Sequence, residues 1–180
     1  MLIKILKILF LAILLICIQI AAVPNLPSVF SNLNVFLTTL IFISVVFKFS
    51  SGIGYGLIWA VVLDLYSPYP FGAYLAITML TLFVVYEIFS HFLTNKSYYS
   101  LLVLTLIATL IFNIFNLLFI ESKLFVETKD YILMQQAGLA FLQNFAWQIG
   151  LNMLLASVLF FFLQQFSKRF NAVFIDTTKN

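Results

Sequence analysis

The ionisable side chains that could do chemistry are few and lie in apolar surroundings. Glu87 and His91 are four residues apart, so on a helix they share one face and are close enough to hydrogen-bond. An ionisable group at membrane depth is costly and is by default a candidate functional site. We expect structural pairing at a helix end, with a proton relay as the alternative. His91 is the only histidine and Cys17 the only cysteine, and no catalytic triad, HExxH motif or phosphate-binding loop is present. The sequence therefore predicts no enzyme, no catalytic residue, no metal site and no cofactor.

Amide side chains form a second polar set. Asn113 and Asn116 lie in one apolar segment, whereas Asn144, Gln148 and Asn152 recur every four residues in another. If both segments are helices, the two sets lie at overlapping depths. Hydrogen bonds between the two helices are the favoured interpretation. A polar cavity that holds a small ligand is the alternative.

Small residues also recur every four positions. Gly52, Gly56 and Ala60 form a stripe along one face of a helix, and Asp64 continues the stripe. Small side chains at this spacing allow another helix to approach closely. A carboxylate at a helix C-terminus faces the negative end of the helix dipole, which is unfavourable. One expectation is that Asp64 accepts hydrogen bonds from unpaired backbone N–H groups at the start of the next helix, near Phe71 to Tyr74. The alternative, of equal weight, is a solvated carboxylate at the helix end.

The composition determines which elements must position these residues. The chain has 180 residues, of which 64% are hydrophobic and only 8% are charged. A soluble domain would need a more polar surface. This excludes a soluble enzyme, a disordered chain and a disulfide scaffold, and it predicts a membrane protein that crosses the bilayer several times. The basic residues are scattered, without the dense patch that binding to nucleic acid requires.

The apolar segments predict an all-α fold, a polytopic bundle of six transmembrane helices that forms one membrane domain over residues 1–180. The expected spans are approximately 5–23, 32–47, 52–66, 73–93, 101–120 and 138–163. Five spans remain an alternative, if the second and third segments form a re-entrant hairpin or if the first is a cleaved signal peptide. Glu121 to Tyr131 contains five charges, and we expect it to be a loop.

Basic residues predict the orientation, because they concentrate on the cytoplasmic side of a membrane protein. With six spans and a cytoplasmic N-terminus, only Lys123 and Lys129 lie outside. The inner segments hold Lys4, Lys7, Lys48, Lys96, Lys168, Arg169 and Lys179. Both termini are therefore expected to be cytoplasmic.

The segment from Phe49 to Gly72 resembles the core motif of the MreD family of bacterial rod-shape-determining proteins. In that family, a glycine-containing helix ends in a Gly-Leu-x-x-Asp-like stretch, followed by a short Pro-x-Gly-like turn and the next helix. Asp64, Pro70 and Gly72 match this pattern. Ala60 stands where the family usually has glycine. The motif covers about 24 residues, and the rest of the chain agrees with the family only in hydropathy.

The resemblance implies a non-catalytic scaffold in the bacterial cytoplasmic membrane, within the complex that guides lateral peptidoglycan synthesis and cell shape. The implied partner is MreC, with MreB, RodA and a penicillin-binding transpeptidase in the wider assembly. It also implies a fold similar to the substrate-binding membrane subunits of energy-coupling-factor vitamin transporters. Such a vitamin-binding subunit is the alternative function, and it would use polar residues of the outer half as a pocket.

Overall fold

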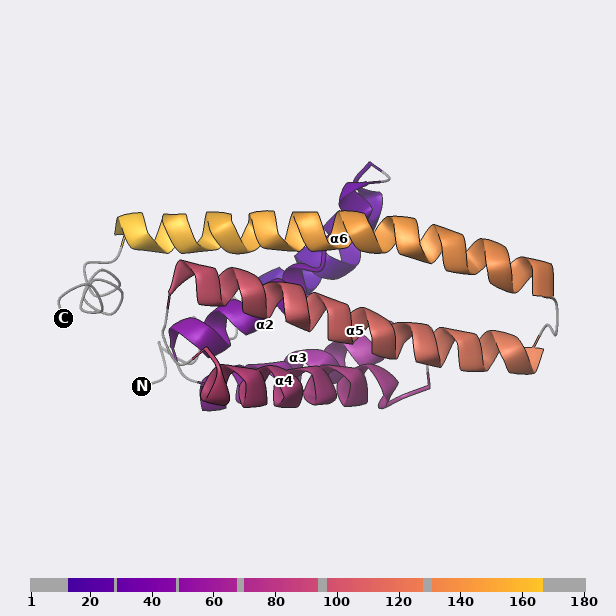
Figure 1. The fold of residues 1–180 in the computed structure, drawn as a ribbon, viewed down its shortest axis with the longest axis horizontal. Coiled ribbons are helices and arrows are strands. Elements are labelled where there is room, and N and C mark those ends of the chain that lie inside the picture. Colours follow the sequence, from indigo (N-terminus) through magenta and orange to yellow (C-terminus); the bar gives the residue numbers. More distant parts are fainter. Residues whose placement is uncertain are drawn as a thin grey trace.

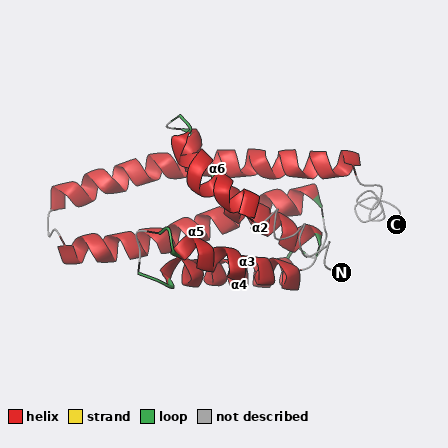
Figure 2. Cartoon of the chain, turned by 180° about the vertical axis from the view of Figure 1, so that it is seen from behind, coloured by secondary structure: helices red, strands yellow, loops and turns green. Residues whose placement is uncertain are grey.

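The computed structural model describes residues 13–27, 29–47, 49–67, 70–93, 97–127 and 131–166, with side chains described outside 119–142 and 166. Every regular element in these ranges is a helix, and no strand occurs among them (Figure 2). The all-α class predicted from the apolar segments is therefore confirmed. Within the described residues, three helical stretches are long and apolar enough to cross a membrane, and three shorter apolar helices accompany them.

The first described segment, Ile13–Asn25, is a short apolar helix. It changes from α-helix to a π-helical turn, η1 (Ile18–Ala22), and then to a 3₁₀ turn, η2 (Val23–Asn25). Pro24 lies within η2, and the chain becomes extended at Leu26, as expected where proline prevents further helix. A second 3₁₀ turn, η3 (Phe30–Asn32), leads to the next helix. Residues 5–12 of the first predicted span lie outside the described residues.

Helix α2 (Val35–Val46) occupies the centre of the bundle. Asn34 caps it, since its side-chain oxygen accepts a hydrogen bond from Leu37 N at 2.9 Å. Nearly every residue of α2 is buried, including Thr38 and Ser44. At about 1.5 Å per residue, its 12 residues span about 18 Å, which is less than the apolar thickness of a bilayer. Because nearly all of its residues are buried, the other parts of the chain surround α2.

Helix α3 (Phe49–Asp64) follows α2, and α4 (Ala73–His91) then packs along α3. The second and third predicted segments are thus two separate helices, and α3 begins earlier than residue 52. Each of them is shorter than the roughly 20 residues that a span requires. Helix α4 coincides closely with the predicted span at 73–93 and is long enough to cross a membrane.

Helices α5 (Tyr98–Glu127) and α6 (Tyr131–Phe166) are longer than predicted. The loop expected from Glu121 to Tyr131 is wrong over most of that range, because α5 continues to Glu127 and α6 begins at Tyr131. Residues 128–130 lie outside the described residues. No glycine or proline interrupts the segment, and leucine, lysine and glutamate favour helix. The charged residues of this segment therefore did not end the helix. At about 1.5 Å per residue, α5 and α6 are about 45 Å and 54 Å long. They run antiparallel and extend beyond the other helices (Figure 1).

The core lies where α2 meets the other helices. Leu40, Ile41 and Val45 of α2 are fully buried there. Helices α3 to α6 contribute further fully or almost fully buried hydrophobic residues, which include Trp59, Ile77, Leu82, Val85, Leu104, Ala108 and Ala156. Helix α2 is short but is fixed in place by the longer helices around it. Helix α3 is fixed because it packs against both α2 and α4.

Candidate functional site

Asp64 connects the end of α3 with the beginning of α4. Its carboxylate accepts three backbone hydrogen bonds, from Gly72 N at 3.1 Å, Tyr74 N at 2.8 Å and Leu75 N at 3.1 Å. The side chain is only 4% exposed. The predicted capture of backbone amides by Asp64 is thus present, and it extends one residue beyond the predicted stretch, to Leu75. We refer to these three hydrogen bonds as the Asp64 clasp.

The turn before α4 supplies the remaining backbone contacts of the clasp. Ala73 N donates to Pro70 O at 3.0 Å, so none of the N–H groups from Gly72 to Leu75 is left unpaired. Gly72 has a φ of 94°, a left-handed conformation that glycine adopts without a steric penalty. Pro70 and Gly72 therefore form the turn that directs these N–H groups toward Asp64.

The electrostatics of the clasp favour a carboxylate. The N-terminus of a helix carries a partial positive charge, and unpaired N–H groups there bind anions. The favourable dipole of α4 therefore compensates for the unfavourable position of Asp64 at the C-terminal end of α3. Hydrogen bonds to an ionised acceptor are also stronger than those between neutral groups. The clasp thus fixes the ends of α3 and α4 relative to each other.

The small-residue stripe lies on the buried face of α3. Gly52, Gly56, Ala60 and Asp64 are all buried. A Cβ atom on Gly56 would lie 2.9 Å from Leu82 Cδ1 of α4 and 3.3 Å from the methyl groups of Leu40 of α2. This agrees with the tight helix contact expected at Gly56.

Gly52, the first residue of the predicted stripe, makes an even closer contact than Gly56. A Cβ atom there would overlap Ser44 Oγ of α2 and would lie 3.1 Å from Ser44 Cα. By contrast, a Cβ atom on Gly54 would have no neighbour within 4 Å. The four-residue spacing therefore identifies Gly52 and Gly56, which are packed, and leaves out Gly54, which is exposed.

The amide side chains of α5 and α6 form interhelical hydrogen bonds. Asn113 Nδ2 donates to Gln148 Oε1 at 2.6 Å. Asn152, which is fully buried, donates from Nδ2 to Thr109 Oγ1 at 3.0 Å and accepts from Asn34 N at 2.9 Å. Asn152 therefore joins α5, α6 and the beginning of α2. The interhelical bonding expected for these amides is present.

Asn116 is not part of this network. Its Oδ1 atom is buried and has no hydrogen-bond partner in the described part of the chain. The pattern of α5 alone did not distinguish it from Asn113. Only Asn113 lies within hydrogen-bonding distance of Gln148 of α6 among the contacts described.

The contrast between the two asparagines gives a prediction. Asn152→Leu should lower the free energy of unfolding by about 1–3 kcal/mol, because it leaves a buried N–H of Asn34 unpaired. Asn116→Leu should be neutral or stabilising, since it removes a buried oxygen without a partner. Thermal unfolding of both variants in the same detergent measures the difference. Equal losses of stability would contradict the assigned network.

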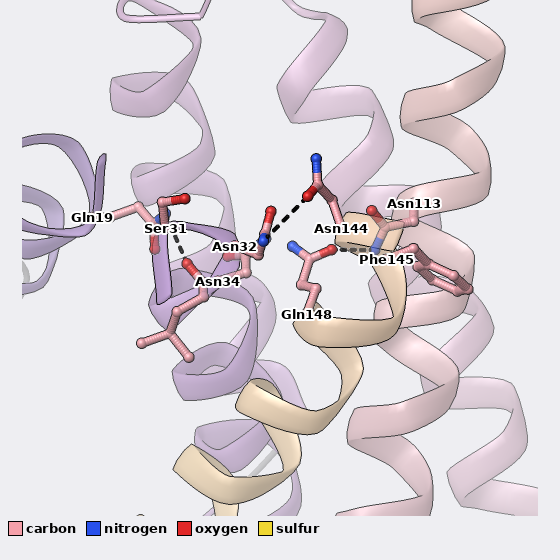
Figure 3. Close-up of a pocket in the computed structure, with 9 residues that line it drawn as sticks. Gln19, Ser31, Asn32, Asn34, Asn113, Asn144, Phe145 and Gln148 are labelled. Atoms are coloured by element: carbon pink, nitrogen blue, oxygen red, sulfur yellow. Dashed lines mark hydrogen bonds between the residues drawn. The ribbon is translucent and has the colours of Figure 1, made fainter. Parts of the chain in front are cut away.

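A polar pocket lies between the N-terminal turns and the helices α5 and α6 (Figure 3). Its volume is about 250 Å³. The lining residues are Gln19, Ser31, Asn32, Leu33, Asn34, Asn113, Asn144, Phe145 and Gln148. Three predicted amides therefore come together here, and Asn144 Oδ1 accepts a long hydrogen bond from Asn32 at 3.5 Å. Asn152 lies beside this group through its bond to Asn34 N.

The sequence reasoning missed the N-terminal half of this pocket. Gln19 lies in η1, and Ser31 and Asn32 lie in η3. Gln19 Oε1 accepts from Phe36 N at 3.2 Å, so it supports the first turn of α2. A signal was available in Asn34, because asparagine directly before an apolar run is a common N-cap.

Glu87 and His91 form the expected pair, with His91 Nδ1 3.5 Å from Glu87 Oε2. The two side chains are 46% and 66% exposed, and Nδ1 also lies 2.9 Å from Glu87 O. An exposed pair of this kind contributes little to stability. The described residues contain no group of three or more His, Cys, Asp or Glu side chains that could hold a metal ion.

No family model, curated protein or solved structure matches the chain. The class of the protein is therefore assigned from its structure. It is an all-helical bundle in which, among the described residues, three helices are long and apolar enough to cross a membrane. Within this bundle, the two best-defined polar features are the Asp64 clasp and the amide-lined pocket.

Proposed function

We propose that the chain is a non-catalytic scaffold subunit of a bacterial cell-elongation complex in the cytoplasmic membrane. The observation that supports this most is the Asp64 clasp, in which one buried carboxylate accepts three backbone hydrogen bonds at the start of α4. Asp64 and Gly72 belong both to the clasp and to the MreD-like motif, and Pro70, the third matched residue, lies in the turn before α4. A scaffold must present a fixed surface, and the clasp rigidifies one end of two neighbouring helices.

The proposed partner is MreC, and MreB, RodA and a penicillin-binding transpeptidase belong to the wider assembly. The clasp shapes the end of the bundle where α3 ends and α4 begins. In the proposed orientation this end faces outward, because the turn at Ser67 to Gly72 follows the third span. Partner binding there would depend on the relative position of the two helix ends.

The test of this function is reconstitution with the partner. The full chain and MreC from the same bacterium are purified separately and combined in phosphatidylethanolamine–phosphatidylglycerol nanodiscs. The proposal predicts that the two proteins elute together in a defined ratio. MreC that elutes alone, from nanodiscs in which the chain is folded, would contradict the proposed partner.

The second candidate is a substrate-binding membrane subunit of an energy-coupling-factor-type vitamin transporter. The specific observation in its favour is the amide-lined pocket of about 250 Å³. Co-purification with a pair of energy-coupling ATPases would favour this function over the scaffold.

The proposed orientation gives a prediction that is independent of the partner. Reporter fusions after Tyr131 and at Asn180 should report outside and inside, respectively, because seven of the nine basic residues then lie on the cytoplasmic side. Alkaline phosphatase and green fluorescent protein fusions measure the two sides in living cells. An outside signal at Asn180 would overturn the topology.

A further inference from the structure

The amide-lined pocket contains more hydrogen-bonding groups than its own walls satisfy. Six of its nine lining residues have amide side chains. Gln148 uses its oxygen to accept from Asn113, and Asn144 uses its oxygen to accept from Asn32. Among the described residues, neither Gln148 Nε2 nor Asn144 Nδ2 has a partner. Both amino groups remain available as donors (Figure 3).

The two most buried residues of the pocket add one further donor and one acceptor. Asn34 is 5% exposed and Asn113 is 7% exposed. Asn34 uses its oxygen to cap α2, which leaves Nδ2, and Asn113 uses Nδ2 for two bonds, which leaves Oδ1. Neither remaining atom has a partner in the described part of the chain. Polar atoms that line a pocket without a protein partner can hydrogen-bond to an occupant, so a pocket that collects four such groups is suited to a polar occupant.

The lining also restricts the charge and size of that occupant. No charged side chain belongs to the described lining, and an ion placed there would lack the compensating charge that a buried ion needs. At about 30 Å³ for each water-sized group, a volume of about 250 Å³ holds about eight such groups. This is the scale of a single small ring. Three donors and one acceptor suit hydroxyl groups, because each hydroxyl both accepts and donates.

From these features we propose that the pocket between η3, α5 and α6 binds an uncharged sugar ring, either free or as the headgroup of a membrane lipid. Gln148 and Asn144 donate to ring hydroxyl oxygens, and Asn113 Oδ1 accepts from a hydroxyl. The site is separate from the Asp64 clasp, with which it shares no residue. It therefore goes beyond the scaffold role and does not depend on it.

The test uses the full chain in nanodiscs and two sources of the same chemistry. One arm measures binding of radiolabelled glucose by equilibrium dialysis. The other adds monoglucosyl-diacylglycerol to phosphatidylglycerol nanodiscs and measures lipid retention by native mass spectrometry. Binding in the first arm indicates a free sugar, and binding in the second arm alone indicates a lipid headgroup. Binding in neither arm overturns the proposal.

Variants of α6 connect the binding to the pocket. Gln148→Met keeps the length of the side chain and should weaken binding about fivefold or more, the effect of losing one hydrogen bond. Asn144 is exposed, so Asn144→Ala provides a second variant that keeps the fold and should also weaken binding. Gln143→Ala is the matched control, because this exposed neighbour does not line the pocket. Parent-like binding by both pocket variants would overturn the proposal, whether or not the chain binds MreC.

Discussion

Asp64→Leu should lower the free energy of unfolding by about 3–5 kcal/mol, because it removes every acceptor of the clasp at once. Three N–H groups at the beginning of α4 would then lack their partner in a part-buried site. Leucine also brings no charge to compensate for the dipole of α4. Thermal unfolding in nanodiscs, followed by circular dichroism, measures the loss.

Asp64→Asn separates the charge from the shape. Asparagine keeps one acceptor oxygen, but its amino group would face N–H donors that now contact Oδ1 and Oδ2. We expect a smaller loss, about 1–2 kcal/mol. If the clasp contributes to stability, the free energy of unfolding should fall in the order parent, Asp64→Asn, Asp64→Leu. If Asp64→Leu unfolds at the temperature of the parent, the three hydrogen bonds do not contribute to stability.

Gly52→Leu should cost about 3 kcal/mol or more, and the variant should accumulate poorly in membranes. Even a Cβ atom at this position would overlap the side chain of Ser44 and approach its backbone. Overpacking of a tight core typically costs about 1–3 kcal/mol, and more where backbone must move. The affected contact joins α2 to α3 at the centre of the bundle.

The same substitution at a neighbouring glycine gives a matched control. Gly54 lies on the same helix, is exposed, and has open space where a Cβ atom would be. Gly54→Leu should therefore leave the yield and the unfolding temperature close to those of the parent. Quantitative blotting of membrane fractions and unfolding in detergent compare the two. Equal behaviour of the variants would show that α2 does not contact α3 at Gly52.

The sequence predicted the helical class and the clasp because both follow from local rules. Apolar composition indicates buried helices, and a carboxylate before a Pro-x-Gly turn indicates a capped helix. The pairing of Asp64 with N–H groups eight to eleven residues later is short-range in the chain. The positions of Asp64 and of the following turn in the sequence were therefore sufficient to predict this pairing.

The pocket and the helical hairpin depend on information that spacing does not contain. Gln19 and Asn144 are far apart in the sequence, and the packing of α6 against η3 brings them to one pocket. The lengths of α5 and α6 follow from uninterrupted helix propensity through a charged segment. The expected loop assumed that a helix ends where its apolar stretch ends. That assumption fails where helix propensity continues through a charged segment.

Retention of MreC by clasp variants is the most direct measurement of the proposed scaffold role. The parent, Asp64→Asn and Asp64→Leu are produced with MreC in a bacterial host, and the MreC recovered with each is normalised to the level of the chain. Gly54→Leu provides the folded control. The account predicts full retention for the parent and the control, less for Asp64→Asn and least for Asp64→Leu. Parent-like retention of MreC by Asp64→Leu, at a normal level of the chain, would contradict it.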